Sequence, residues 1–309
     1  MPLKFKKSII IFVVGPTAIG KTRLAVKLAK RIHGEIISCD SMQVYKGMRI
    51  LSQVPNISER KGVMHHLAGV LDPGKEYNAA IFSRKAVRVI RAIIKKRKIP
   101  IVVGGSGLYA KALIDGIFPS PKADYAFRSD MNTFVSHHGS PCLYKRLSKI
   151  DASTAKAIHP NDARRIIRAL EIYHSTGKTM TELKGETKGL ADTNDIRIFG
   201  LTMPREDIYE NINRRVDKMF GEGIVNEVKA LKKRNLSKTA KAVLGLKEIT
   251  GYLDGENDLE TAKRLLKRNT RRFAKRQLTW FRADKRVRWF DLKKYNDSII
   301  IKNITKEVA

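Results

Sequence analysis

The chain has 309 residues, 42% of them hydrophobic, so it can bury a sizeable core, and we expect one large domain carrying a smaller one. Lysine and arginine number 62 against 30 acidic residues, which gives a formal net charge of +32. Such an excess favours a polyanionic partner, above all nucleic acid, over scattered surface charge, and no apolar run is long enough for a membrane span. The two cysteines, Cys39 and Cys142, make a disulfide framework or a cysteine zinc site unexpected and fit a cytoplasmic protein.

The first predicted element is a buried strand over 9–14, followed by the sequence G-P-T-A-I-G-K-T at 15–22. This G-x-x-x-x-G-K-T pattern is typical of a phosphate-binding P-loop, in which backbone N–H groups and a helix N-terminus surround an anion. Lys21 supplies an ammonium group, and the Thr22 hydroxyl is suited to a Mg²⁺ ligand. Apolar residues at 24, 28 and 32 predict the helix that the loop requires. The short apolar run leads straight into this loop, which argues against a signal peptide.

A second short strand over 35–39 ends at Asp40, in the stretch D-S-M-Q-V-Y at 40–45. In open α/β sheets this strand end is where ligands bind, so Asp40 could accept a proton, hold Mg²⁺ through water, or cap a turn. The pair His65 and His66 has no further histidine or cysteine nearby, which favours a hydrogen-bonding role over a metal site.

A helix is predicted over 78–98, followed by a strand over 99–103 that runs into Gly104-Gly105-Ser106-Gly107. This junction is expected at the same sheet edge as the P-loop, either as a part of the site or as a tight turn that needs glycine. The strand lacks the terminal aspartate that directs Mg²⁺ in ordinary P-loop ATPases, which weakens a nucleotide-hydrolysis interpretation.

From 118 to 195 the hydrophobic pattern is helical throughout, and we predict an inserted helical domain. Within it, Arg164 and Arg168 share one helix face, where they could grip phosphates, stack on bases or simply face solvent. The core, predicted over 1–117 and 196–309, resumes with a strand over 197–203 and helices over 205–219 and 224–234. A long basic helix over 261–286 interleaves lysine and arginine with Phe273, Trp280 and Phe281, which could be core residues or platforms for bases.

Together these stretches resemble one family, the tRNA dimethylallyltransferases, also called tRNA isopentenyltransferases or the IPP transferase family. The matching motifs, all in order, are the loop at 15–22, D-S-M-Q-V-Y at 40–45, H-H-L at 65–67, G-G-S-G-L-Y at 104–109, I-H-P-N-D-x-x-R-I-x-R-A-L-E at 158–171, T-G-K at 176–178, P-R at 204–205, R-V-D-x-M at 215–219 and A-K-R-Q-x-T-W-F-R at 274–282. The resemblance covers nearly the whole chain and fits a bacterial type without a zinc-finger extension.

The resemblance implies a P-loop NTPase-like α/β core with a parallel sheet, flanking helices and an inserted helical domain that clamps the anticodon stem-loop. The implied reaction transfers a dimethylallyl group from dimethylallyl diphosphate to the exocyclic N6 amine of adenosine 37, just 3′ of the tRNA anticodon. The P-loop would then hold a diphosphate leaving group and Mg²⁺ instead of a nucleotide. A flipped adenine, tRNA and dimethylallyl diphosphate as partners, no membrane and a monomeric cytoplasmic enzyme are expected.

By the same resemblance, Asp40 accepts the proton of the adenine amine, and Ser106, where the family usually has threonine, assists at the reacting centre together with Lys21 and Thr22. The residues implied to bind diphosphate are Gly15, Pro16, Thr17, Ala18, Ile19, Gly20, Lys21 and Thr22, with Arg215 as a further ligand and Thr22 as the metal ligand. Those implied to contact tRNA are Asp40, Ser41, Met42, Gln43, Ser106, Arg128, Arg164, Arg165, Ile166, Ile167, Arg168, Ala242, Val243, Leu244, Gly245, Leu246, Lys247, Lys275, Arg276, Gln277, Leu278, Thr279, Trp280, Phe281 and Arg282.

Several positions depart from the family pattern. Ile19 replaces a serine, Leu51-Ser52-Gln53-Val54 stands where G-T-A-K is common, Ala163-Arg164 replaces Pro-Gln, and Leu246 replaces a tyrosine.

Two other functional classes also account for part of the sequence. A P-loop kinase for a small metabolite explains the loop but not the charge, and a non-catalytic RNA-binding NTPase explains the charge but not Asp40 or Ser106.

Overall fold

The computed structural model describes residues 7–118 and 121–308, which divide into two compact units. The first contains residues up to Ile114 and from Leu190 onward, and the second is Asp115–Gly189. The insertion was expected over 118–195, so both of its boundaries lie earlier than predicted. Leu190 is 8% exposed and packs in the core of the first unit, while Asp195 already pairs with Ile9. Residues 1–6, 119–120 and 309 of the predicted domains lie outside the described part.

The described residues of the first unit form a parallel six-stranded sheet at its centre, with strand order β3-β2-β4-β1-β5-β6. The strands are β1 Ile9–Val14, β2 Gly34–Ser38, β3 His65–His66, β4 Ile99–Gly104, β5 Asp195–Thr202 and β6 Val287–Asp291. Because parallel strands present their carboxyl ends at one edge, the segments after β2, β4 and β1 are neighbours there. These are the three segments in which the sequence placed Asp40, Ser106 and the P-loop.

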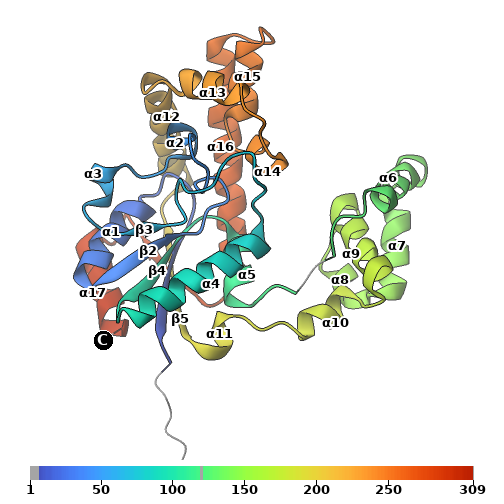
Figure 1. Ribbon diagram of the computed structural model, residues 1–309, viewed down its shortest axis with the longest axis horizontal. Coiled ribbons are helices and arrows are strands. Elements are labelled where there is room, and N and C mark those ends of the chain that lie inside the picture. The colour runs from blue at the N-terminus through green and yellow to red at the C-terminus, as the bar shows by residue number, and fades with distance from the viewer. Residues whose placement is uncertain (1–6, 119–120, 309) are drawn as a thin grey trace, which may run out of the picture. The chain divides into compact units, whose positions relative to one another are not determined.

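Helices cover both faces of the sheet (Figure 1). The helices of this unit are α1 Lys21–Arg31, α2 Arg49–Ser52, α3 Ile57–Arg60, α4 Ala79–Lys95, α5 Gly107–Ile114, α11 Leu190–Thr193, α12 Arg205–Gly221, α13 Ile224–Lys232, α14 Lys238–Lys241, α15 Leu246–Leu253, α16 Leu259–Arg282 and α17 Asp297–Val308. No described helix is both long and apolar enough to cross a membrane.

The β-branched run of β1 explains its central place, because alternate side chains enter two separate cores. Ile10 and Phe12 pack with α4, α5 and α12, whereas Ile11 and Val13 pack with α1 and α17. All four side chains are fully buried. Burying both faces of one strand in this way requires a continuous apolar sequence, which β1 and β4 both have.

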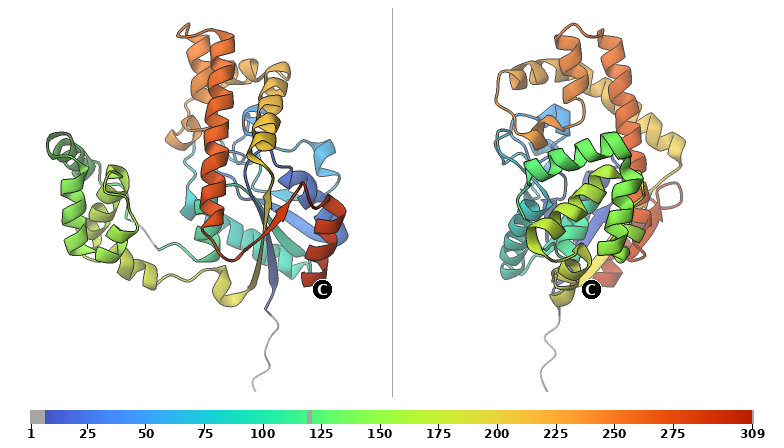
Figure 2. Two further views of the ribbon diagram at one scale, coloured as in Figure 1. Left: turned by 180° about the vertical axis from the view of Figure 1, so that it is seen from behind. Right: turned by 90° about the vertical axis from the view of Figure 1, so that its right-hand side faces the viewer.

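The long helix α16 lies beside α12 and α15, as both views in Figure 2 show. Its apolar positions Leu266, Ala274 and Phe281 face the core, and its inner face also reaches α5. The predicted extent to 286 was wrong, because the helix ends at Arg282 and the chain turns into β6.

In its described part, the second unit consists of five helices around their own core: α6 Tyr125–His138, α7 Ser140–Ile150, α8 Ala152–Lys156, α9 Ala163–Thr176 and α10 Met180–Gly185. Leu143, Leu147, Ile166 and Leu170 form its buried centre. Asp151 caps α8 by accepting from the Thr154 N–H, and its carboxylate also accepts hydrogen bonds from Thr181. The all-helical character that the pattern predicted is present.

Candidate active site

The P-loop connects β1 directly to α1, and it is shaped by residues with left-handed backbone. Gly20 has φ +89° as the N-cap residue of α1, and Ala18 has φ +62°. This geometry leaves the first N–H groups of α1, including those of Lys21 and Thr22, at the loop without partners from their own helix. A helix N-terminus of this kind carries partial positive charge and favours an anion.

Lys21 projects back over the loop, and its Nζ donates a 2.6 Å hydrogen bond to the Pro16 carbonyl. Burial lowers the pKa of Lys21 to about 7, the nearby Asp40 carboxylate opposes this shift, and the Arg215 guanidinium adds to it. The Lys21 ammonium therefore lies within electrostatic reach of both Asp40 and Arg215. An incoming anion would restore its full charge.

Asp40 follows β2 and lies across from Ser106, which follows β4. One oxygen of Asp40, Oδ1, accepts hydrogen bonds from the N–H groups of Met42 (2.8 Å) and Gln43 (3.3 Å). This is the turn-capping role that the sequence left open, yet within the described residues Oδ2 makes no hydrogen bond and remains available. Ser106 Oγ accepts from the Ser41 N–H at 3.1 Å, so Ser106 holds the same turn from the other side.

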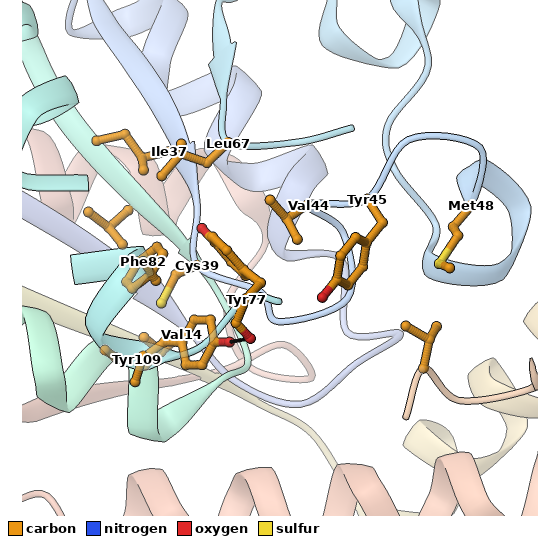
Figure 3. Packing of buried hydrophobic residues seen from close by; sticks show 14 of the residues in the cluster. Val14, Ile37, Cys39, Val44, Tyr45, Met48, Leu67, Tyr77, Phe82 and Tyr109 are labelled. Atoms are coloured by element: carbon orange, nitrogen blue, oxygen red, sulfur yellow. Dashed lines mark hydrogen bonds between the residues drawn. The ribbon is translucent and has the colours of Figure 1, made fainter. Parts of the chain in front are cut away.

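The strand end that carries Asp40 rests on an aromatic cluster (Figure 3). Cys39 is buried with the rings of Tyr77, Phe82 and Tyr109, which stack or meet edge to face. Tyr109 donates a hydrogen bond to the Tyr77 carbonyl, shown as a dashed line in Figure 3. Rings packed in this way fix the backbone before Asp40, so the carboxylate has a defined position.

Arg215 of α12 reaches the P-loop. It donates from Nη1 to Thr17 Oγ1 (3.0 Å) and from Nε to Gln53 Oε1 (2.9 Å). Gln277 of α16 accepts from the Thr17 N–H at 2.8 Å. Gln53, in the segment that departs from the family pattern, also accepts from Gln43 Nε2 through its carbonyl. These contacts join the P-loop to both the Asp40 turn and α16.

A cavity of about 1010 Å³ opens over this arrangement. Lys21, Thr22, Asp40 and Arg215 line it together with apolar side chains that include Leu51 and Phe273. The cavity thus combines cations and a helix N-terminus with an apolar wall and the Asp40 carboxylate, and Glu59 and Glu222 line it as well. Such a combination suits a ligand with an anionic head and an apolar tail, next to a second reactant that gives up a proton.

The predicted RNA-contacting residues at 242–247 and 275–282 fall into three groups by exposure. Lys247, Lys275, Arg276, Thr279, Trp280 and Arg282 are exposed, as is Ala242 in the turn before α15. The side chains of Val243, Leu246, Gln277 and Phe281 are buried, as is Gly245, whereas Leu244 and Leu278 are half-buried. Burial withdraws the buried set from side-chain contact with a partner, so only the first group is kept as a candidate RNA surface.

In the second unit the prediction is divided in the same way. Arg164 and Arg165 are exposed on α9, but Ile166 and Ile167 belong to its core. Arg128 and Arg168 are both ion-paired with Glu171, a fully buried carboxylate that also accepts from the Asp124 N–H. Burial opposes ionisation of Glu171, but hydrogen bonds from Arg128 and Arg168 hold its pKa below the ordinary value.

Sequence reasoning missed the roles of Glu171, Gln53 and Glu227. Glu227 of α13 accepts from the N–H groups of Ile50 and Leu51 and so positions α2 beside the cavity. The sequence pointed to Glu171 only as the last residue of the motif at 158–171, and to Gln53 only because the segment 51–54 differs from the family pattern. His66, in contrast, hydrogen-bonds Glu35 at 2.8 Å, and the described residues hold no group of three or more His, Cys, Asp or Glu side chains suited to a metal.

Comparisons with known proteins agree with this geometry. The IPP transferase family model matches residues 43–284, and the isopentenyl transferase model matches residues 8–75. A tRNA dimethylallyltransferase of Halothermothrix orenii is 46% identical over 288 residues (92% of this chain, 88% of the relative), and one of Carboxydothermus hydrogenoformans is 46% identical over 302 residues (97% of each).

Solved structures give the same result. The chain is similar to the tRNA isopentenylpyrophosphate transferase of Bacillus halodurans, with 42% identity, a TM-score of 0.72, and coverage of 98% of this chain and 96% of that one. It is also similar to a eukaryotic dimethylallyltransferase acting on tRNA, with 30% identity, a TM-score of 0.77, and coverage of 92% and 74%.

Proposed function

Since the chain belongs to the IPP transferase family, we propose that it is a tRNA dimethylallyltransferase that prenylates the N6 amine of adenosine 37. The observation that carries the proposal is the cavity in which the cationic P-loop, a carboxylate and an apolar wall face one space. The +32 charge of the chain favours RNA as the acceptor. A cytoplasmic location follows from this substrate, and one chain supplies every residue named, so a monomer suffices.

The reaction forms a bond between N6 of adenine and C1 of the prenyl group while the bond from C1 to the diphosphate oxygen breaks. The electron pair leaves with the diphosphate, whose new negative charge the loop N–H groups, Lys21 and Arg215 are placed to stabilise. The proton of the amine passes to Asp40, whose Oδ2 has no competing hydrogen bond within the described residues. Ser106 keeps the Asp40 turn in position through the Ser41 N–H.

The residues also suit Mg²⁺. The Thr22 hydroxyl lines the cavity at the start of α1, and Mg²⁺ usually takes one or two protein oxygens together with waters and phosphate oxygens. When bound there with the diphosphate, the ion supplies further charge neutralisation to the leaving group.

The decisive experiment incubates the protein with undermodified tRNA and dimethylallyl diphosphate, digests the RNA and identifies the nucleosides. Isopentenyladenosine is the expected product. Phosphate transfer from ATP to a small metabolite would instead support a kinase, and RNA binding without any product would support a non-catalytic NTPase.

The Asp40→Asn variant tests the proton acceptor. The amide oxygen can still accept from the Met42 and Gln43 N–H groups, so the turn should persist while the base is lost. Loss of a general base predicts a fall in kcat of about 10²–10⁴-fold with little change in tRNA affinity. Asp40→Ala is the comparison, because it removes the turn contacts as well. An Asp40→Asn enzyme with full turnover would exclude Asp40 as the base.

A further inference from the structure

The inner face of α16 lies against the backbone of the Gly105–Gly107 turn. A Cβ atom at Gly105 would lie 2.1 Å from Gln277 Nε2, and one at Gly107 would lie 2.0 Å from Trp280 Cδ1. Side chains at these positions would therefore push the helix away. Because glycine has no Cβ atom, the side chains of Gln277 and Trp280 can pack directly on the backbone of the turn that carries Ser106.

Gln277 also binds the P-loop on its other side. Its Oε1 accepts the Thr17 N–H at 2.8 Å, and Thr17 Oγ1 accepts from Arg215. The Gln277 side chain is 5% exposed, and its Oε1 is the acceptor that the Thr17 N–H has among the described residues. One buried amide thus lies between the loop assigned to diphosphate and the turn that positions Asp40.

The outer face of the same helix segment has the opposite character. Lys275 and Arg276 directly precede Gln277, and both are exposed, as are Thr279 and Arg282. Trp280 is 38% exposed although its ring edge touches the glycine turn. Within two turns, the outer face of α16 therefore exposes cations that an RNA backbone could contact, and its inner face hydrogen-bonds the P-loop.

We propose that Gln277 is a positioning residue that couples RNA binding on the outer face of α16 to diphosphate binding in the P-loop. The inference rests on the proposed function. RNA bound at Lys275 and Arg276 restrains α16. Because Gln277 hydrogen-bonds Thr17 and α16 packs closely against Gly105 and Gly107, the P-loop is restrained with the helix. Coupling between two sites is reciprocal, so diphosphate must tighten RNA binding by the same factor.

The test measures four dissociation constants for the full-length protein by calorimetry. Inorganic pyrophosphate with Mg²⁺ and a synthetic anticodon stem-loop RNA are the probes, each titrated alone and in the presence of the other. The wild type is expected to bind pyrophosphate at least about fivefold more tightly with RNA present. Gln277→Met, which keeps the volume but has no acceptor for the Thr17 N–H, should weaken pyrophosphate binding about tenfold and reduce the coupling factor to about one.

Two further variants keep the test sharp. Gln277→Asn retains an amide that is too short to reach Thr17 and should behave as Gln277→Met does, which covers the case in which methionine disturbs folding. Arg264→Gln, at an exposed position two turns or more before this segment on α16, should leave the coupling factor at the wild-type value. Thermal unfolding of each variant verifies that the fold is retained.

Independent binding of the two probes to the wild type would overturn the inference, as would an undiminished coupling factor in both Gln277 variants. The proposed function is tested separately, because it fails only if the wild type yields no prenylated nucleoside. A wild type that prenylates tRNA but shows no coupling refutes the role of Gln277 and leaves the activity standing.

Discussion

At the scale of single residues, the chemistry depends on Lys21, whose amine is only partly protonated at neutral pH before a ligand binds. Burial lowers its pKa to about 7, with Asp40 opposing and Arg215 reinforcing that shift. Above this pH the free protein holds Lys21 neutral, and an anion can bind fully only if the amine takes up a proton. Diphosphate binding therefore raises the pKa of Lys21 and is linked to proton uptake.

The affinity for pyrophosphate is consequently expected to weaken as the pH rises above about 7, by up to about tenfold per pH unit for one linked proton. Calorimetry in buffers of different ionisation enthalpy measures both the affinity and the number of protons taken up. Lys21→Arg is the matched control, because a guanidinium stays charged and the part of the slope due to this residue should vanish. Identical slopes for the two proteins would contradict the assignment.

At the scale of elements, the sequence predicted secondary structure best where a segment is uniformly apolar or carries a recognisable motif. The continuous apolar runs of β1 and β4 and the motifs at their ends predicted the strands, the P-loop and the Gly105 turn, and the α/β fold with a P-loop-like core is confirmed. β6 was missed, because exposed Arg288 and half-buried Trp289 separate buried Val287 from buried Phe290, so V-R-W-F-D has no regular alternation and it follows a long basic helix. β3 is only two residues long and owes its existence to pairing with β2.

The site shows the same limit. Motifs brought Lys21, Asp40, Ser106 and Arg215 together, but the contacts of Gln277 with Thr17 could not be predicted, since they join residues 260 positions apart in the chain. The mixed fate of 242–247 and 275–282 has a simple cause. A motif names consecutive residues, whereas a helix turns only every third or fourth of them to the core and the others toward solvent.

The exposed face of α16 makes a prediction of its own. Replacing Lys275 and Arg276 together by alanine should weaken tRNA binding and lower the slope of log affinity against log salt by about 1.5–2, since two phosphate contacts are lost. Filter binding across a range of salt concentrations measures the slope. A Lys30→Ala, Lys95→Ala pair is the control, because these exposed lysines end α1 and α4 at the opposite edge of the sheet. An unchanged slope for the α16 pair would remove this face from the RNA interface.

At the scale of the whole molecule, the chain combines two units with separate cores, and the core of the second contains the fully buried carboxylate of Glu171. Glu171→Gln would leave Arg128 and Arg168 close together without a counter-charge. Removing one partner of a buried ion pair costs about 3–5 kcal/mol, and the partial exposure of both arginines places the expected loss at or below the lower end of that range.

Hydrogen exchange is the appropriate measurement, because it separates the two units. Amides of α6 and α9 should exchange faster in Glu171→Gln, tRNA should bind more weakly, and the pyrophosphate affinity of the first unit should not change. Glu182→Gln, an exposed residue that caps α10 in the same unit, is the control and should affect only its own helix. Unaltered protection of α6 and α9 would show that the ion pairs are dispensable.

The places where the chain leaves and re-enters the first unit bear on how the protein folds. α5 and α11, which flank the second unit in sequence, lie in contact, and within the second unit Gly116 approaches the Lys188 carbonyl so closely that a Cβ atom would lie 2.6 Å from it. Once the second unit forms, its first and last residues lie close together, so it connects α5 to α11 over a short distance. The entropic penalty of bringing β5 alongside β1 then falls, so the late strands can complete the sheet as though the intervening helices were absent.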